Sequence, residues 1–131
     1  MIPHCEVDSD YVRANVDLGH LNVCGEGTEA LSNLEGLVIH AHISDNDGHA
    51  DTNGLIGTGT TPIRAYIEAL EDYGIDKAAR SYGVEPVAAI EVGSLSTGLE
   101  GLAGDTQDPD EIARRCVSYL LREVPTLEID A

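Results

Sequence analysis

The sequence predicts an α/β fold in which short parallel strands alternate with helices that lie on one face of the sheet. Segments near residues 12–17, 37–43 and 87–92 alternate between apolar and polar residues, as strands do. A helical pattern follows each segment, and the resulting β-α-β-α-β-α order favours parallel strands with right-handed crossovers. At 131 residues the chain has room for one domain with a modest core, so we expect residues 1–131 to form a single domain.

Each predicted strand has one aliphatic face and one face that becomes polar toward its C-terminal end. The aliphatic positions are Val12, Ala14, Val16, Leu37, Ile39, Ala41, Ile43, Ile90 and Val92. The opposite positions are Arg13, Asn15, Asp17, Val38, His40, His42, Ala89 and Glu91. Strands of a closed barrel show this pattern when their upper ends line a site.

The helical segments differ in how clearly they are marked. Residues 28–34 form a short pattern, whereas residues 62–73 carry a strong apolar face, with Thr60 or Thr61 as cap and Pro62 in the first turn. The last helix starts at Asp108 with a cap, a first-turn proline and acidic residues near its positive end, and buries Cys116. Residues 76–82 offer an extra turn or two, and residues 93–107 read as a loop.

The charge balance is extreme, with 24 acidic against 7 basic residues. Because the acids are spread over a chain with clear apolar periodicity, the composition favours a folded halophilic protein with a solvated acidic surface. A basic face for nucleic acid is missing, so a nucleic-acid partner is not expected. There is no apolar run long enough for a membrane span and no signal peptide at the start, which predicts a cytoplasmic protein. Three widely spaced cysteines argue against a disulfide framework.

Acidic and histidine side chains stand at the ends of all three predicted strands. Asp17, His42 and Glu91 would meet at one edge of a parallel sheet, and such nitrogen and oxygen ligands suit a divalent metal. His20 follows Asp17 by three residues and would reach back over the site. His40 shares a strand face with His42 but lies deeper, as a support or a substrate contact.

Other readings of these residues remain open. Asp17 could instead cap local amides. For Glu91 the surroundings favour a site, because a carboxylate buried among aliphatic residues is costly unless it is paired or bound to a cation. Asp51 follows in an acidic loop that lacks the spacing of a calcium-binding loop. Gly57-Thr-Gly59 could bring amides near an anion, and a tight turn explains the pair of glycines equally well.

Four motifs in sequence resemble the C-terminal part of the xylose-isomerase-like TIM barrel superfamily, the sugar phosphate isomerases and epimerases. The resemblance covers residues 12–122 and implies a partial TIM barrel made of the last three βα units. The motifs are Val16-Asp17-Leu-Gly-His20, His40-Ala-His42-Ile-Ser-Asp45-Asn46-Asp47-Gly48, Asp51 with Gly57-Thr-Gly59, and Ala89-Ile90-Glu91-Val92.

The resemblance implies a metal-dependent isomerisation or epimerisation of a sugar or sugar phosphate through an enediolate. Manganese, magnesium, cobalt or zinc would be held by Asp17, His42 and Glu91 together with a second glutamate. Glu91 would also exchange a proton next to the substrate carbonyl, while the metal polarises the oxygens. His20 would act in catalysis by contacting substrate oxygens, and we expect His40 and Asp51 to contact the substrate as well.

Two departures from the family pattern define the alternatives. The second metal glutamate would come from the fifth strand, and this chain starts just before the sixth. The chain could therefore be a non-catalytic fragment, or a subunit whose open barrel edge is covered by a partner chain or by self-association. The related apurinic endonucleases share the Asp and His motifs, but Asp51-Thr-Asn53 stands where the family often has Asp-x-His, and basic residues are few.

Overall fold

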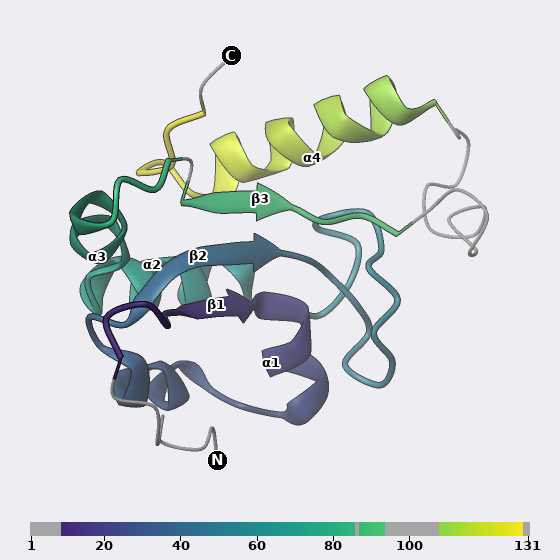
Figure 1. The fold of residues 1–131 in the computed structure, drawn as a ribbon. Helices are drawn as coiled ribbons and strands as arrows, with labels where there is room; N and C mark the ends of the chain where they lie inside the picture. Colours follow the sequence, from purple (N-terminus) through teal and green to yellow (C-terminus); the bar gives the residue numbers. More distant parts are fainter. Residues whose placement is uncertain (1–8, 86, 94–107, 130–131) are drawn as a thin grey trace.

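The computed structural model describes residues 9–85, 87–93 and 108–129 (Figure 1). Helices and strands alternate along this part of the chain. In order, the elements are β1 (Ala14–Asp17), α1 (Leu18–Cys24), the 3-10 helix η1 (Thr28–Leu34), β2 (Val38–Ile43), α2 (Ile63–Asp72), α3 (Ile75–Ser81), β3 (Ala88–Ile90) and α4 (Pro109–Glu123). None of the described helices is long and apolar enough to cross a membrane.

The three strands form one parallel sheet in the order β1-β2-β3, which confirms the predicted α/β architecture with a parallel sheet. The register sets Asp17 opposite His42, and His42 opposite Ala89. Just beyond β3, the amide of Glu91 donates to the carbonyl of Ile43 at 2.9 Å. The carboxyl ends of all three strands therefore lie at the same edge of the sheet.

An irregularity in the β1–β2 ladder corrects one predicted strand face. Ala14 pairs with Val38 and Asn15 pairs with His40, so Ile39 is an extra residue on β2. A bulge of this kind reverses the alternation on one side of it. Val38, which was predicted to lie beside His40 and His42, is instead buried in the core.

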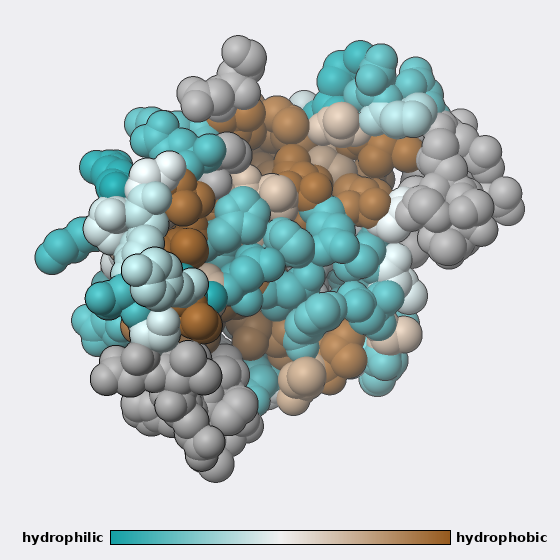
Figure 2. Space-filling model, viewed as in Figure 1, coloured by the Kyte–Doolittle hydropathy of each residue, from teal (hydrophilic) through white to brown (hydrophobic). Residues whose placement is uncertain are grey.

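One face of the sheet packs on helices, and no described helix covers the other face. Aliphatic side chains of β1 and β2 form a single core with α2 and α4, including Ile67, Cys116 and Leu120. In Figure 1, α2 passes behind the sheet and α4 runs along β3. The opposite face carries Asn15, His40 and His42, and a hydrophilic band crosses the middle of the molecule there (Figure 2). Burial raises the pKa of the Cys116 thiol, as its predicted place on the buried helix face implies.

Helix starts differ from the expected ones at two places. The chain enters α1 directly after β1, with no intervening turn, because the Asp17 carboxylate caps the helix by accepting from the amide of His20 at 3.1 Å. At α2 the cap position is Pro62, and no side chain caps it, so neither Thr60 nor Thr61 has the expected role. The start of α4 is as predicted, since Asp108 accepts from the amide of Asp110 at 3.0 Å. The predicted loop at 93–107 lies, apart from its first residue, outside the described residues.

Candidate metal centre

Side chains from the ends of all three strands converge at the carboxyl edge of the sheet. Asp17, His42 and Glu91 each offer one ligand atom, and these atoms lie within 4.8 Å of one another. His42 Nδ1 is 3.0 Å from Glu91 Oε2 and 3.7 Å from Asp17 Oδ2. The structure thus brings together the three residues that the sequence singled out as metal ligands.

The two carboxylate oxygens of Asp17 have different surroundings. Oδ1 accepts from the Ser44 hydroxyl at 2.6 Å and from the His20 amide at 3.1 Å, whereas Oδ2 faces His42 and His20. Burial opposes ionisation of Asp17, but these hydrogen bonds and the nearby His20 outweigh it and lower the pKa of this carboxyl. Asp17 is therefore an oriented carboxylate with Oδ2 directed at the other ligands.

A buried polar network holds the start of α1 against the end of β2. Ser44, fully buried, accepts from the amide of Gly19 at 2.9 Å while it donates to Asp17. The buried Asn46 side chain donates to the carbonyl of Gly19 and accepts from Asn22, at 2.9 and 2.8 Å. A side chain on Gly19 would collide with Ser44 and Asn46. Sequence analysis missed Ser44 and Asn46 as supports, and only their place directly after a histidine-bearing strand hints at the role.

His20 and Asp51 form a pair beside the three ligands. His20 Nε2 lies 2.8 Å from Asp51 Oδ2 and 3.9 Å from Asp17 Oδ2. Partial burial lowers the pKa of His20, but the Asp51 hydrogen bond and the charges of Asp17 and Asp51 reverse this and raise it. Both side chains are substantially exposed, with 60% and 43% of their surface accessible, so they line the open side of the site.

His40 lies on the same sheet face, two residues deeper along β2. Its ring meets the ring of His42 edge-on, with centroids 5.6 Å apart and planes at 89°. The amide nitrogen of Asn15 is 3.5 Å from Nε2 of His42, on the side away from Asp17 and Glu91. Asn15 and His40 thus flank the imidazole of His42, which presents Nδ1 to the two carboxylates.

Asp45 has a structural role that sequence analysis did not identify. Its carboxylate is almost fully buried and accepts four backbone N–H groups, those of Asn46, Gly57, Gly59 and Thr61, at 2.9–3.1 Å. A side chain at Gly59 would collide with Asn46 and with Asp45 itself. The glycine pair therefore does place amides around an anion, but that anion belongs to the protein.

The donor set at the sheet edge matches a divalent cation. One imidazole nitrogen and two carboxylate oxygens suit magnesium, manganese, cobalt or zinc better than soft metals, which prefer thiolates. Two carboxylates and one neutral histidine would also balance a +2 charge. These residues are only partly buried, so water or substrate oxygens could complete the coordination.

Comparisons with known proteins identify one distant relative. No family model matches the chain, and no solved structure matches it. An uncharacterized protein, MJ1311, of the archaeon Methanocaldococcus jannaschii is 31% identical over 74 residues, which is 54% of this chain and 25% of that protein. The match thus covers about a quarter of the relative's length, and that protein's name gives no activity.

Proposed function

We propose that this chain is the C-terminal part of a metal-dependent sugar or sugar phosphate isomerase or epimerase with a xylose-isomerase-like barrel. The observation that carries the proposal is the convergence of Asp17, His42 and Glu91, each from the end of a different parallel strand, within 4.8 Å. Active sites of βα barrels lie at this edge, where each strand supplies a side chain.

The side chains around the three ligands suit proton transfer next to a carbonyl. A bound divalent metal would polarise the carbonyl and hydroxyl oxygens of the substrate. Glu91, whose side chain is 42% exposed, can take a proton from the adjacent carbon and return it to the neighbouring carbon of the enediolate, which isomerises the substrate. His20, held by Asp51 at 2.8 Å and with a raised pKa, donates hydrogen bonds to substrate oxygens.

Manganese binding by two histidine variants tests the metal site. His42→Ala removes a proposed ligand, whereas His40→Ala removes the neighbouring imidazole on the same strand face. We expect His42→Ala to weaken manganese binding by at least ~100-fold, because even the loss of supporting residues costs 10–100-fold. His40→Ala should weaken it by about tenfold or less. Free Mn²⁺ measured by electron paramagnetic resonance gives both constants, and undiminished binding by His42→Ala would rule out this site.

Deuterium exchange tests the chemistry separately. Ketoses and their phosphate esters incubated in D2O with the manganese-loaded protein should gain deuterium at the carbon beside the carbonyl, and Glu91→Gln should abolish the exchange. A Glu91→Gln variant that exchanges at the original rate would remove Glu91 from the mechanism.

Incubation with abasic DNA at high salt is expected to give no nicking, and nicking would favour the endonuclease alternative.

The open face of the sheet supports a second candidate function, that of a subunit completed by a partner chain. β1 and β3 are both edge strands within the described residues, and the polar face that carries His40 and His42 lies open (Figure 2). A partner that covered this face would shield the site from water. We expect no turnover by the isolated chain if it needs such a partner. Measurable isomerisation by the purified chain alone would reject this candidate.

A further inference from the structure

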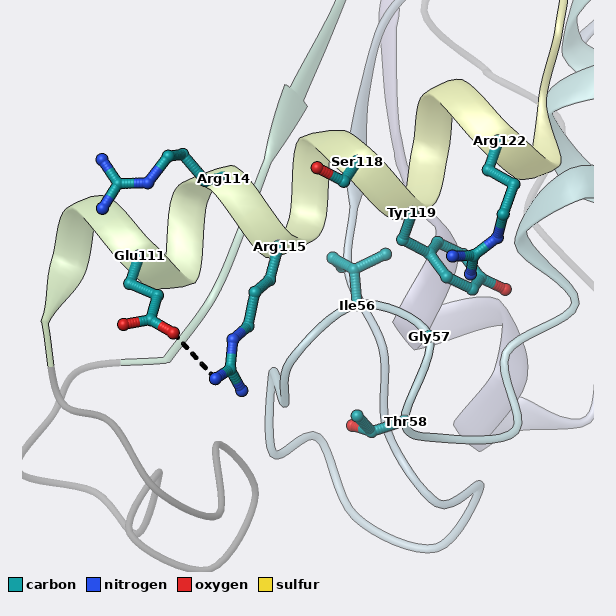
Figure 3. Close-up of a pocket in the computed structure, with 9 residues that line it drawn as sticks. All are labelled: Ile56, Gly57, Thr58, Glu111, Arg114, Arg115, Ser118, Tyr119 and Arg122. Atoms are coloured by element: carbon teal, nitrogen blue, oxygen red, sulfur yellow. Dashed lines mark hydrogen bonds and ion pairs between the residues drawn. The ribbon is translucent and has the colours of Figure 1, made fainter.

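A cleft separate from the candidate metal centre lies between α4 and the loop that follows β2. Its volume is about 440 Å³, within the range of about 300–1,000 Å³ for small-molecule sites. Arg115, Tyr119 and Arg122 project from one face of α4, with Ile56 and Thr58 on the facing loop (Figure 3). No residue of the proposed metal centre lines this cleft.

The cleft gathers positive charge on an acidic protein. Three of the chain's seven basic residues line it, namely Arg114, Arg115 and Arg122, against one carboxylate, Glu111. The chain as a whole carries a formal charge of −17. In Figure 3, Arg115 and Arg122 extend toward the loop, whereas Arg114 points away from it. Arg115 therefore borders the cleft beside the loop, and Arg122 borders it beside the Tyr119 ring.

These guanidinium groups pair with exposed partners. Arg115 pairs with Glu111 at 2.8 Å, and Arg122 pairs with Glu123 at 3.0 Å and lies over the Tyr119 ring at 5.5 Å. Exposed ion pairs of this kind contribute little to stability, so these glutamates do not hold the arginines tightly. The Tyr119 ring gives the Arg122 guanidinium a second contact beside the cleft, in addition to its ion pair.

The loop opposite the arginines is fixed before any ligand binds. Asp45 holds the amides of Gly57 and Gly59 at 2.9 Å, and Thr58 donates its hydroxyl to the carbonyl of Leu55 at 2.6 Å. A side chain at Gly57 would collide with the ring of Tyr119, which shows how closely loop and helix approach. Since these two amides already serve Asp45, an external anion would be recognised by the arginine side chains.

We propose that this cleft binds the phosphate group of a small phosphorylated molecule between Arg115 and Arg122. Guanidinium groups bind phosphate through paired N–H donors, and a dianion balances two of them. Ser118 of α4 also lines the cleft. The cleft is larger than a phosphate, and Ile56 with the Tyr119 ring provides an apolar surface for the rest of the ligand.

The test measures glucose 6-phosphate binding by equilibrium dialysis of the full chain in molar KCl with EDTA, so that no metal takes part. The variant Arg115→Gln/Arg122→Gln should bind at least tenfold more weakly than the unmodified chain. The matched control, Arg64→Gln/Arg80→Gln, removes the same charge from α2 and α3. Like Arg115, Arg64 is paired with a glutamate four residues away, Glu68. This control should keep its affinity within twofold. Circular dichroism establishes that both variants are folded.

Competing ligands define what the cleft recognises. Inorganic phosphate should compete with glucose 6-phosphate, while glucose should neither bind nor compete. Equal weakening by the control variant would overturn the proposal, because the effect would then reflect overall charge. Binding of glucose, or of a thymidine oligonucleotide in the absence of any small-phosphate binding, would also overturn it. Failure here leaves the metal centre untouched, since manganese binding is measured without sugar phosphate.

Discussion

The two carboxylates of the candidate metal centre are held in different ways. The Asp17 side chain is 10% exposed and has one oxygen committed to Ser44 and the His20 amide, whereas the Glu91 side chain is 42% exposed. A ligand needs a fixed position, while a group that exchanges protons with a substrate needs access to it. In the proposed reaction this difference would let Asp17 hold the metal rigidly, while the more accessible Glu91 would both bind the metal and exchange a proton with the substrate.

Replacing Ser44 by alanine should loosen Asp17 without removing a ligand. The hydroxyl that donates to Asp17 would be lost, and the buried amide of Gly19 would lose its acceptor. A buried donor without a partner costs about 1–3 kcal/mol of folding free energy. We expect that loss in urea titrations, and manganese binding weaker by about 10–100-fold, as for other residues that orient ligands. Manganese affinity equal to that of the unmodified chain would show that Ser44 does not orient Asp17.

At the scale of elements, the segment between β2 and α2 acts as one unit built around Asp45. Its carboxylate accepts amides from both ends of the segment, from Asn46 and from Thr61, as well as from the glycines between. This single buried charge thus shapes the loop that borders the arginine cleft. The adjoining Ser44 and Asn46 connect the same loop to the start of α1 and to Asp17.

Asp45→Asn should therefore destabilise the protein well beyond the effect of a surface substitution. The new amide NH2 group would face two backbone N–H groups, which would lose their acceptor. Each buried donor left without an acceptor costs about 1–3 kcal/mol, so the free energy of unfolding should fall by roughly 2–6 kcal/mol. Asp47→Asn is the matched control, because Asp47 is exposed and accepts only the amides of His49 and Ala50. Urea titrations in molar KCl compare the two, and equal losses would contradict the role given to Asp45.

The accuracy of the sequence predictions depended on how local the signal was. Period-two alternation found all three strands, and the ends of those strands located Asp17, His42 and Glu91. The bulge at Ile39 was not predicted, because an extra residue in a ladder is defined by the partner strand.

Long-range contacts escaped the sequence analysis for the same reason. Nothing in the motif Ser44-Asp45-Asn46-Asp47 distinguishes the buried Asp45 from the exposed Asp47, since the amides that Asp45 binds lie 12–16 residues further on, apart from that of Asn46. The arginine cleft was also missed. The α4 segment was assessed only for its capped, acidic start and its apolar stripe, and the loop that faces its arginines is distant in sequence.

The molecule as a whole combines a strong acidic surface with an open polar sheet face. A formal charge of −17 on 131 residues disfavours the compact state in dilute buffer through self-repulsion. In 1 M salt the screening length falls to about 3 Å, so this repulsion is largely removed. A cation bound between two carboxylates and a histidine would remove a further, local share of it, at the sheet edge where all three strands end.

Thermal unfolding followed by circular dichroism in molar KCl, with and without manganese, tests whether the isolated chain assembles this centre. A ligand present at 100 times its dissociation constant, and bound only by the folded state, adds about 2.7 kcal/mol of stability. For a domain of this size the midpoint should rise by roughly 5–15 °C. EDTA should reverse the rise, and His42→Ala should abolish it while His40→Ala retains most of it. A cooperative transition that manganese leaves unmoved would show that the three ligands do not form a site in the chain alone, and would favour completion by a partner chain.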